Sequence, residues 1–338
     1  MIEKSEFKNI VRIGKHVVID SEGENTRILT YSSVNTFWIE IENIEVNCVV
    51  DQMSFMNSVS KLETVNIKEI KNGIIVYDED KEFKLNKLLA YPKFHDLKVN
   101  FDKAIEVEEG FDIISKHLSS TILSDLNDNE SRNGILISED TICSTNRMGC
   151  TIVDNNYIKV KNSLVITKAA IRHIEEASKI LIEGNFLNFK NGNFFGKLLC
   201  LENIFPNLRT TLDSIVYKNN FTIYGKTLAK EIENYKVLFN KDDIIEQSSM
   251  IFNIKENLLE ISYKTDKGEF SRELDITCDV PLVFHLNPVL FLNLLKSFTG
   301  EIIIWYKDDK TPLKIIGDNV IKLFMGNVIQ DGTEYRED

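Results

Sequence analysis

The sequence lacks the features that mark membrane proteins, exported proteins and the commonest enzyme classes. No window reaches the roughly 18 consecutive apolar residues that a membrane-spanning helix needs. The first six residues do not show the charged-then-apolar pattern of a secretory signal. The sequence has no Gly-rich phosphate loop, no H-E-x-x-H zinc motif and no G-x-S-x-G nucleophile motif. We therefore expect a cytoplasmic protein, not an enzyme, with no membrane segment, no cofactor and no catalytic residues.

Cysteine is also scarce, and its five copies are scattered along the chain. None forms a C-x-x-C pair, and no histidine lies at metal-ligand spacing from one of them. This pattern favours buried thiols in a reducing compartment and predicts no metal site. The five are Cys48, Cys143, Cys150, Cys200 and Cys278.

Positive charge is in deficit, with 40 lysines and arginines against 52 aspartates and glutamates and a net charge of −12. A protein that binds nucleic acid on an open surface is usually basic, so the negative net charge argues against such a surface. It does not exclude a basic surface that is local. The carboxylate pairs Glu175-Glu176 and Asp242-Asp243 are expected to be solvated rather than catalytic. We expect His173 to be a helix-surface or channel residue and His285 to be a packed histidine, rather than catalytic bases. A hydrolase on an unrelated fold is therefore a weak third interpretation.

Only five prolines occur, and two of them share a setting that indicates an internal repeat. Pro92 and Pro206 each follow an apolar strand pattern and an aromatic residue, and they are 114 positions apart. A repeat of about one third of the chain predicts three similar units. The predicted domains are residues 1–94, 95–212 and 213–329, followed by an acidic tail at 330–338.

Helix start signals support the same division. Asp51, Thr167 and Asn287 are good N-cap residues, and their spacings are 116 and 120. Each is expected to open the second helix of its domain, and Pro288 strengthens the last start. The predicted helices are Ser5–Val17, a helix after Asp51, Glu109–Leu123, Lys168–Lys179, Gly225–Asn240 and a helix from Pro288.

Strand patterns outnumber the helices. Alternating apolar residues and short connections favour antiparallel sheets, and two helices per domain would cover one sheet face. The fold class is therefore α+β. Because units joined head to tail can pair edge strands, three units in one chain predict half of a six-unit ring completed by a second chain. The predicted strands are Arg27–Tyr31, Thr36–Ile41, Thr64–Ile70, Gly73–Tyr77, Phe83–Leu89, Gly134–Ser138, Thr141–Thr145, Gly149–Asp154, Ile180–Glu183, Phe186–Lys190, Phe194–Leu201, Met250–Ile254, Leu258–Tyr263, Phe270–Ile276, Glu301–Tyr306, Leu313–Gly317 and Val320–Met325.

Several short segments in this order resemble one family, the bacterial DNA polymerase sliding clamp (the beta subunit of the replicative polymerase). The segments that carry the resemblance are Phe205–Arg209, Asn133–Ile137 with Ser144–Met148, Phe270–Ile276 and Phe284–Phe298. The resemblance spans the whole chain, and domain 1 diverges most. It implies a bacterial or phage-encoded ring with sheets outside and helices inside, which tethers a polymerase to duplex DNA and is opened by a loader.

The resemblance also implies sequence-independent phosphate contacts from basic residues on the helices that line the ring. Such contacts would explain how an acidic protein holds DNA. The expected DNA-facing residues are Lys8, Arg12, Lys15, Lys116, Lys168, Arg172, Lys226, Lys230 and Lys296. Lysines on exposed helix faces also occur simply as solubilising residues.

A partner pocket between the second and third domains is implied as well, and it would take short linear motifs of polymerases and other DNA-processing proteins. This chain lacks the Gly-His that the family usually has before Arg147, and it has Met325-Gly326-Asn327 where the family has Met-Pro-Met. The acidic tail is expected to cover part of this pocket. The expected pocket residues are Arg132, Thr145, Arg147, Met148, Pro206, Thr211, Leu323 and Met325.

Closure of the ring would make the protein a homodimer. The resemblance assigns Val237, Leu238 and Phe239 to the subunit interface, and an alternative is that they are core residues. A second interpretation of the whole protein is a clamp-like scaffold for protein interactions that does not encircle DNA.

Overall fold

A computed structural model describes most of the chain. The described residues are 2–4, 7, 15–22, 25–32, 35–42, 44–88, 97, 99–122, 134–146, 148–201, 205–239, 249–265, 267–278 and 280–326. Four predicted site residues lie outside them, namely Lys8, Arg12, Arg132 and Arg147. The tail at 330–338 also lies outside them.

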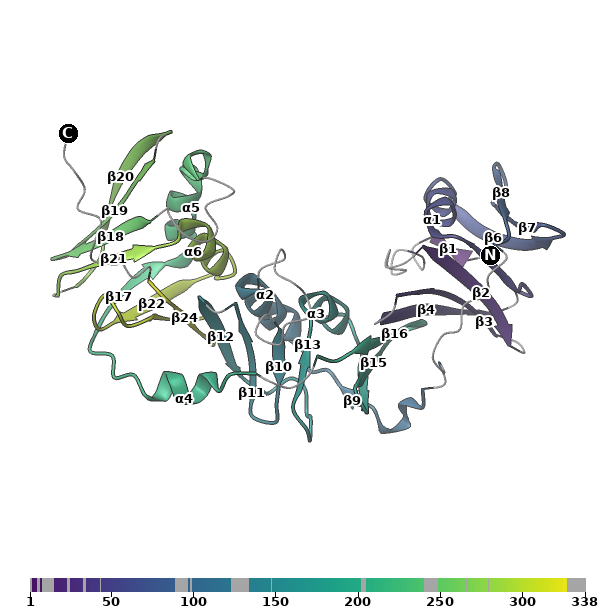
Figure 1. Cartoon of the computed structure of the whole chain (residues 1–338), viewed down its shortest axis with the longest axis horizontal. Helices are drawn as coiled ribbons and strands as arrows, with labels where there is room; N and C mark the ends of the chain where they lie inside the picture. Colours follow the sequence, from purple (N-terminus) through teal and green to yellow (C-terminus); the bar gives the residue numbers. More distant parts are fainter. Residues whose placement is uncertain are drawn as a thin grey trace. The chain divides into compact units, whose positions relative to one another are not determined.

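The chain divides into two compact units, each built from two segments of the sequence. One unit comprises Met1–Val107 with Arg172–Cys200, and the other comprises Glu108–Ile171 with Leu201–Asp338. Each contains one eight-stranded and one four-stranded sheet, and all strand pairs within them are antiparallel (Figure 1). The three domain boundaries expected from the sequence stay a prediction.

The first unit has an eight-stranded sheet in the order β5-β2-β3-β4-β16-β15-β14-β9 and a four-stranded sheet in the order β1-β6-β7-β8. The larger sheet contains β5 (Cys48–Asp51), β2 (His16–Glu22), β3 (Asn25–Tyr31), β4 (Asn35–Glu42), β16 (Phe194–Leu199), β15 (Phe186–Asn191), β14 (Lys179–Glu183) and β9 (Ile105–Glu106). The smaller contains β1 (Ile2–Glu3), β6 (Thr64–Ile70), β7 (Gly73–Tyr77) and β8 (Glu82–Asn86). Helix α1 (Gln52–Ser60) and the 3₁₀ turn η2 (Phe101–Lys103) also lie here.

The second unit repeats this plan with sheets in the orders β13-β10-β11-β12-β24-β23-β22-β17 and β20-β19-β18-β21. The larger contains β13 (Leu164–Ile166), β10 (Ile135–Ile137), β11 (Thr141–Thr145), β12 (Gly149–Asp154), β24 (Val320–Phe324), β23 (Leu313–Gly317), β22 (Glu301–Tyr306) and β17 (Asn219–Tyr224). The smaller contains β20 (Gly268–Asp275), β19 (Leu258–Thr265), β18 (Met250–Lys255) and β21 (Leu282–Leu286). The helices are α2 (Phe111–Thr121), α4 (Leu208–Asp213), α5 (Gly225–Asn234), the 3₁₀ turn η4 (Lys236–Leu238) and α6 (Pro288–Leu295). Helix α3 (Lys168–Ile174) contributes residues to both units.

In each large sheet, the two middle strands come from distant parts of the chain. β4 pairs with β16 through the partners Trp38 and Phe195. β12 pairs with β24 through the partners Cys150 and Leu323. Each sheet is therefore two four-stranded halves joined at its centre. Such a joint removes two edge strands that would otherwise need covering.

Most predicted elements are confirmed, and several of their ends move. The caps at Asp51, Thr167 and Asn287 each accept a backbone N–H of the helix they precede. α3 ends at Ile174, earlier than predicted, and β14 begins at Lys179. α5 ends at Asn234 and is followed by η4.

The helix predicted for Ser5–Val17 is wrong at its C-terminal end. β2 begins at His16, and Val17 and Val18 are fully buried between β3 and β5. The run of β-branched residues forms a central strand because both neighbouring strands supply hydrogen bonds and apolar contacts. Strands β1, β2, β9 and β17 and helix α4 were not predicted, and only the apolar residues before the three caps indicated β5, β13 and β21. No helix in the described part of the chain has the length and apolar character to cross a membrane.

Candidate functional sites

One face of the β12–β24 joint carries an apolar surface that α4 covers in part. Its buried members are Cys143, Cys150, Ile152, Leu212 and Leu323, and its partly buried members are Leu136, Phe205, Leu208, Tyr217 and Ile321. We call this set the α4 surface. Alternation along each strand explains it, because residues two apart in β12 and β24 lie on the same sheet face. α4 lies on the opposite side of this sheet from α2 and α6 (Figure 1).

Polar contacts hold α4 in place. The side chain of Asn207 caps the helix by accepting the backbone N–H of Thr210 at 3.1 Å. Arg209 forms an ion pair of 2.7 Å with Asp154 at the end of β12. The Tyr217 hydroxyl donates to the carbonyl oxygen of Pro312 at 2.9 Å, and burial raises the pKa of this phenol. The cover of the α4 surface is thus anchored to the sheet on both sides.

The predicted partner-pocket residues fall in and beside this surface. Leu323 is one of its buried members. Pro206 and Thr211 are exposed on the covering segment. Met325 lies just beyond β24, where its backbone N–H donates to the carbonyl oxygen of Met148 at 2.8 Å.

Two other predicted pocket residues have structural roles. The Thr145 hydroxyl donates to the carbonyl oxygen of Gly149 at 3.0 Å within the β11–β12 turn. The side chain of Met148 packs against the core of the third predicted domain rather than against the α4 surface.

Sequence reasoning missed most of the α4 surface. Cys143 and Cys150 are among its buried residues, and burial raises the pKa of each thiol to about 12. Both thiols therefore stay protonated at neutral pH and act as small apolar groups rather than nucleophiles. The signal that could have found them was the two-residue alternation of Thr141–Thr145 and Gly149–Asp154.

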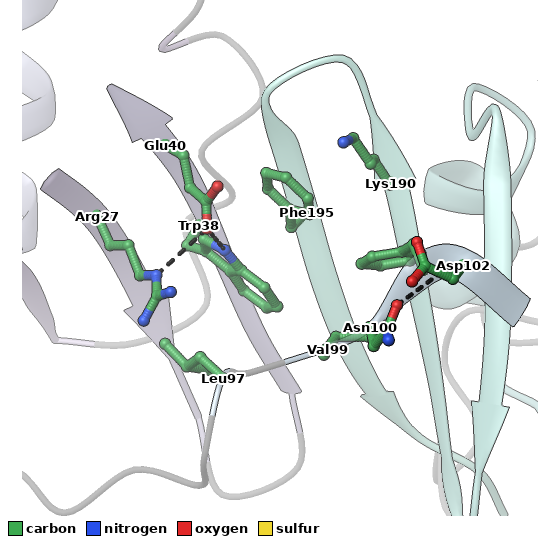
Figure 2. Close-up of a pocket in the computed structure, with 10 residues that line it drawn as sticks. Arg27, Trp38, Glu40, Leu97, Val99, Asn100, Asp102, Lys190 and Phe195 are labelled. Carbon is green, nitrogen blue, oxygen red and sulfur yellow. Dashed lines mark hydrogen bonds and ion pairs between the residues drawn. The ribbon is translucent and has the colours of Figure 1, made fainter. Parts of the chain in front are cut away.

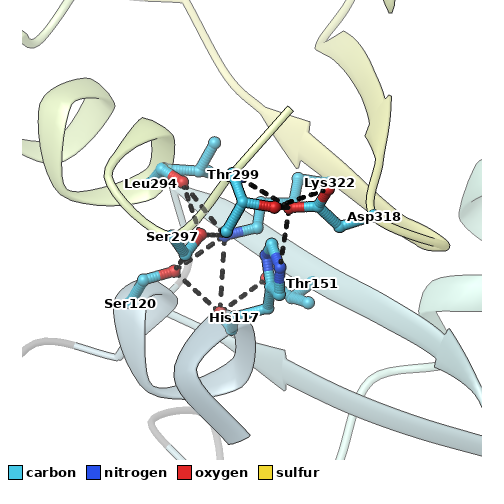
Figure 3. Close-up of polar contacts among 8 residues, drawn as sticks. All are labelled: His117, Ser120, Thr151, Leu294, Ser297, Thr299, Asp318 and Lys322. Atoms are coloured by element: carbon cyan, nitrogen blue, oxygen red, sulfur yellow. Dashed lines mark hydrogen bonds and ion pairs between the residues drawn. The ribbon is translucent and has the colours of Figure 1, made fainter. Parts of the chain in front are cut away.

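The other face of the same joint carries a buried polar cluster around Lys322 (Figure 3). Lys322 has no exposed surface, and its amino group donates to the carbonyl oxygen of Leu294 at 3.0 Å and to Ser297 Oγ at 2.6 Å. It also donates to Ser120 Oγ at 2.7 Å. These acceptors lie in the last turns of α2 and α6 and just beyond, where carbonyl groups lack helix partners. Lys322 thus joins the C-terminal ends of two helices to the sheet beneath them.

His117 lies within this cluster and carries no charge at neutral pH. Its side chain is fully buried, and burial, reinforced by the nearby Lys322, lowers its pKa to about 4. Its Nε2 lies 3.5 Å from the Asp318 carboxylate, which is longer than an ordinary N–H···O bond. The cost of burying an imidazolium therefore outweighs the attraction of the carboxylate.

The basic residues predicted to face DNA differ in how freely their charges are available. Lys226 and Lys230 are exposed one turn apart on α5, and among the described residues neither forms an ion pair. Lys116 lies 3.8 Å from Asp112, and Lys296 pairs with Glu233. The α5 pair thus offers the most available positive charge on the helix layer of this unit.

The remaining basic residues predicted to face DNA differ in their contacts and positions. The amino group of Lys168 donates to the carbonyl oxygen of Ile122 at 2.7 Å, at the C-terminal end of α2. Arg172 is exposed on α3. Lys15 is exposed just before β2 and therefore does not lie on a helix, contrary to the sequence prediction.

The three residues expected at a subunit interface differ in their exposure to solvent. Val237 is 80% exposed, whereas Phe239 is 9% exposed and packs edge-on against Tyr263. Leu238 packs against the same core. Val237 lies in η4, and its neighbour Leu238 lies beside Gly268 of β20, which is an edge strand of its sheet. Val237 is thus the most exposed of the three, and Leu238 is partly buried.

Comparison with solved structures matches nearly the whole chain to bacterial sliding clamps. A putative DNA polymerase III beta subunit from Eubacterium rectale has a TM-score of 0.79 at 16% identity, covering 96% of this chain and 98% of that chain. The DNA polymerase III subunit beta from Pseudomonas aeruginosa has a TM-score of 0.79 at 12% identity, covering 97% and 99%. A DnaN sliding clamp from the same organism, bound to griselimycin, has a TM-score of 0.78 at 12% identity, covering 96% and 97%.

The sequence itself matches no protein-family model and no curated protein. At these identities the likeness in structure shows the fold. The predicted α+β clamp fold is therefore confirmed along nearly the whole chain.

Proposed function

We propose that this protein is a non-enzymatic DNA polymerase processivity factor, a cytoplasmic ring of two chains that encircles duplex DNA. The observation that carries the proposal is the match of fold over almost the full length of both this chain and several sliding clamps. The ring would hold DNA by topology, so that affinity for DNA can stay low. Phosphate contacts from Lys226 and Lys230 would be independent of sequence and would permit sliding.

Retention on circular DNA tests this proposal. The protein is loaded onto a nicked circular plasmid by a bacterial clamp loader and ATP, and bound protein is measured before and after a restriction enzyme cuts the plasmid once. A topologically linked ring stays on the circle and leaves the linear product by its ends. Equal retention on circular and linear DNA would contradict encirclement.

We further propose that the α4 surface binds short linear motifs of a polymerase and of a clamp loader. Its half-buried Leu208 and Phe205 give an apolar contact area beside the polar side chains of Thr211 and Asn207. The variant Leu208→Gln should weaken binding of a replicative polymerase C-terminal peptide about tenfold, because a buried apolar contact is lost. Thr210→Gln, an exposed change on the same helix, should leave binding unchanged.

The acidic tail at 330–338 lies outside the described residues, and its covering role stays a prediction. Deleting it should strengthen peptide binding to the α4 surface. Equal affinity of the full-length and tailless proteins would refute that role.

We propose that the subunit interface forms where β20 and η4 meet a partner chain. β20 leaves backbone groups unpaired at the sheet edge, and Val237 adds an exposed apolar side chain beside it. Stacking of Tyr235 on Phe270, at a centroid distance of 3.8 Å, fixes the end of α5 against this strand.

A protein-interaction scaffold that does not encircle DNA is the second candidate. Two observations favour it: α1 carries no lysine or arginine, and Lys168 donates its amino group to the C-terminal end of α2. A scaffold would retain peptide binding at the α4 surface while showing no preference for circular over linear DNA.

A further inference from the structure

The first unit contains a cavity of about 580 Å³ at the joint between β4 and β16 (Figure 2). Its floor is the cross-strand pair Trp38 and Phe195, whose rings stack with centroids 5.4 Å apart and planes 8° apart. One wall is the segment that contains Leu97, Val99 and Phe101, and these side chains pack against the floor. The volume falls within the roughly 300–1,000 Å³ range of small-ligand pockets.

Charged side chains lie on two sides of this cavity, and they differ in whether they already have a partner. Glu40 accepts from Arg27 Nε at 3.2 Å and from the Trp38 indole at 3.4 Å, so its carboxylate is already paired. Lys190 lies on the other side, with its amino group 5.2 Å from the centroid of the Phe195 ring. Within the described part of the chain Lys190 forms no ion pair. The cavity therefore offers one available cation above an aromatic floor.

The cavity occupies the same place in its sheet as the α4 surface does in the other large sheet. Trp38 and Phe195 are partners on the fourth and fifth strands of one sheet, as Cys150 and Leu323 are on the fourth and fifth strands of the other. In each case a short segment containing a helical turn packs over the pair, η2 in one sheet and α4 in the other.

The two places also resemble each other in one charged residue. A lysine lies over an aromatic ring at each place: Lys190 over Phe195, and Lys314 over Tyr217 at 5.6 Å. The two sites are counterparts in the internal repeat.

We propose that this cavity is a second peptide-binding site, which takes an extended segment that carries an apolar side chain next to an acidic one. The apolar side chain lies against Trp38 and Phe101, and the carboxylate pairs with Lys190. The exposed Asp102 lies on the same side of the cavity as Lys190 (Figure 2), so it repels a second acidic group there, and one carboxylate is the charge that fits beside Lys190. The inference rests on the proposed function only for the class of ligand, a short linear motif.

Tryptophan fluorescence gives a direct test, because the chain has two tryptophans and one forms the floor of this cavity. In a Trp305→Phe background, Trp38 is the sole reporter. The probe is the peptide acetyl-Ala-Asp-Leu-Phe-Ala-amide, titrated to millimolar concentration. We expect a saturable change in Trp38 emission, and a dissociation constant about tenfold higher in Lys190→Gln, because a charge-assisted contact is lost.

The matched control is Lys314→Gln, which makes the same change at the counterpart site and should leave the Trp38 titration unaltered. A probe peptide with Asn in place of Asp should bind the wild-type cavity as weakly as the original binds Lys190→Gln. The variant Lys190→Glu, which should abolish binding, and a thermal melt of each protein separate loss of binding from loss of folding.

Three results would overturn the inference: no saturable Trp38 response, equal affinity of Lys190→Gln and wild type, or weakening by Lys314→Gln instead. The last result would place the peptide on the α4 surface and leave the proposed function intact. Failure of DNA retention with a normal Trp38 titration would instead overturn the proposed function and leave this second site standing.

Discussion

Lys322 and Leu323 are neighbours in β24 that serve opposite faces of the same sheet. The Lys322 amino group binds the C-terminal ends of α2 and α6, whereas the Leu323 side chain lies under α4 in the apolar surface. One strand therefore connects the helix layer, where we place DNA, to the surface where we place partner peptides. A substitution of Lys322 therefore tests the helix layer, and a substitution of Leu323 tests the α4 surface.

Removing the Lys322 side chain should strongly destabilise the second unit. Lys322→Ala should lower the free energy of unfolding by about 2–4 kcal/mol, because a cavity forms and buried acceptors such as the carbonyl oxygen of Leu294 lose their donor. Lys322→Met should cost less, since it keeps most of the side-chain volume. Urea denaturation measures both.

The control for this prediction is Lys310→Ala, which removes an exposed lysine from the loop before β23. It should change the free energy of unfolding by less than about 0.5 kcal/mol. A Lys322→Ala variant as stable as this control would contradict the role assigned to the buried amino group.

His117 should make the protein less stable in mild acid. Its pKa is lowered to about 4 in the folded state, from an ordinary value of 6.5, because burial disfavours the charged imidazole. The unfolded chain thus binds a proton more readily, and this contribution to stability is complete above pH 6.5 and falls as pH drops towards 4. The loss from this group is at most about 3 kcal/mol.

Denaturant midpoints measured from pH 7.5 to pH 4 test this dependence. His117→Gln should flatten the profile in part, and the slope that remains should include His173, whose pKa burial also lowers to about 4. Lys116→Gln, an exposed change on the same helix, should keep the wild-type profile. An unchanged profile in His117→Gln would contradict the assignment.

The α5 lysines should contribute to DNA affinity through phosphate contacts. The double variant Lys226→Glu and Lys230→Glu should weaken binding to duplex DNA and lower the slope of log affinity against log salt by about 1 per lost contact. Fluorescence anisotropy at several salt concentrations measures both quantities.

A charge-matched control is the pair Lys264→Glu and Lys267→Glu, on exposed positions of the β19–β20 hairpin. If only net charge matters, both double variants will lose affinity equally, and the α5 face will have no special role.

Local sequence signals predicted much of the fold. The strands Thr141–Thr145, Gly149–Asp154 and Glu301–Tyr306 have the expected bounds, because apolar alternation between turn residues marks a half-buried strand. The caps Asp51 and Asn287 were recognisable because a short polar side chain precedes each helix.

Local sequence signals could not predict which distant strands pair with each other. Trp38 and Phe195 are far apart in sequence, and nothing near either residue indicates that the two strands join. The same reason hid the Lys322 cluster, since a lysine within an apolar strand is ordinarily interpreted as an exposed residue. Its buried position depends on carbonyl groups that α2 and α6 bring to it from elsewhere in the chain.

The central claim, a closed ring of two chains, is tested most directly by molar mass in solution. Multi-angle light scattering at micromolar concentration should give about 78 kDa, twice the 38.9 kDa of one chain. Val237→Asp, which places a charge on the exposed residue beside β20, should shift the mass towards one chain. A wild-type mass of one chain across the micromolar range would contradict the ring.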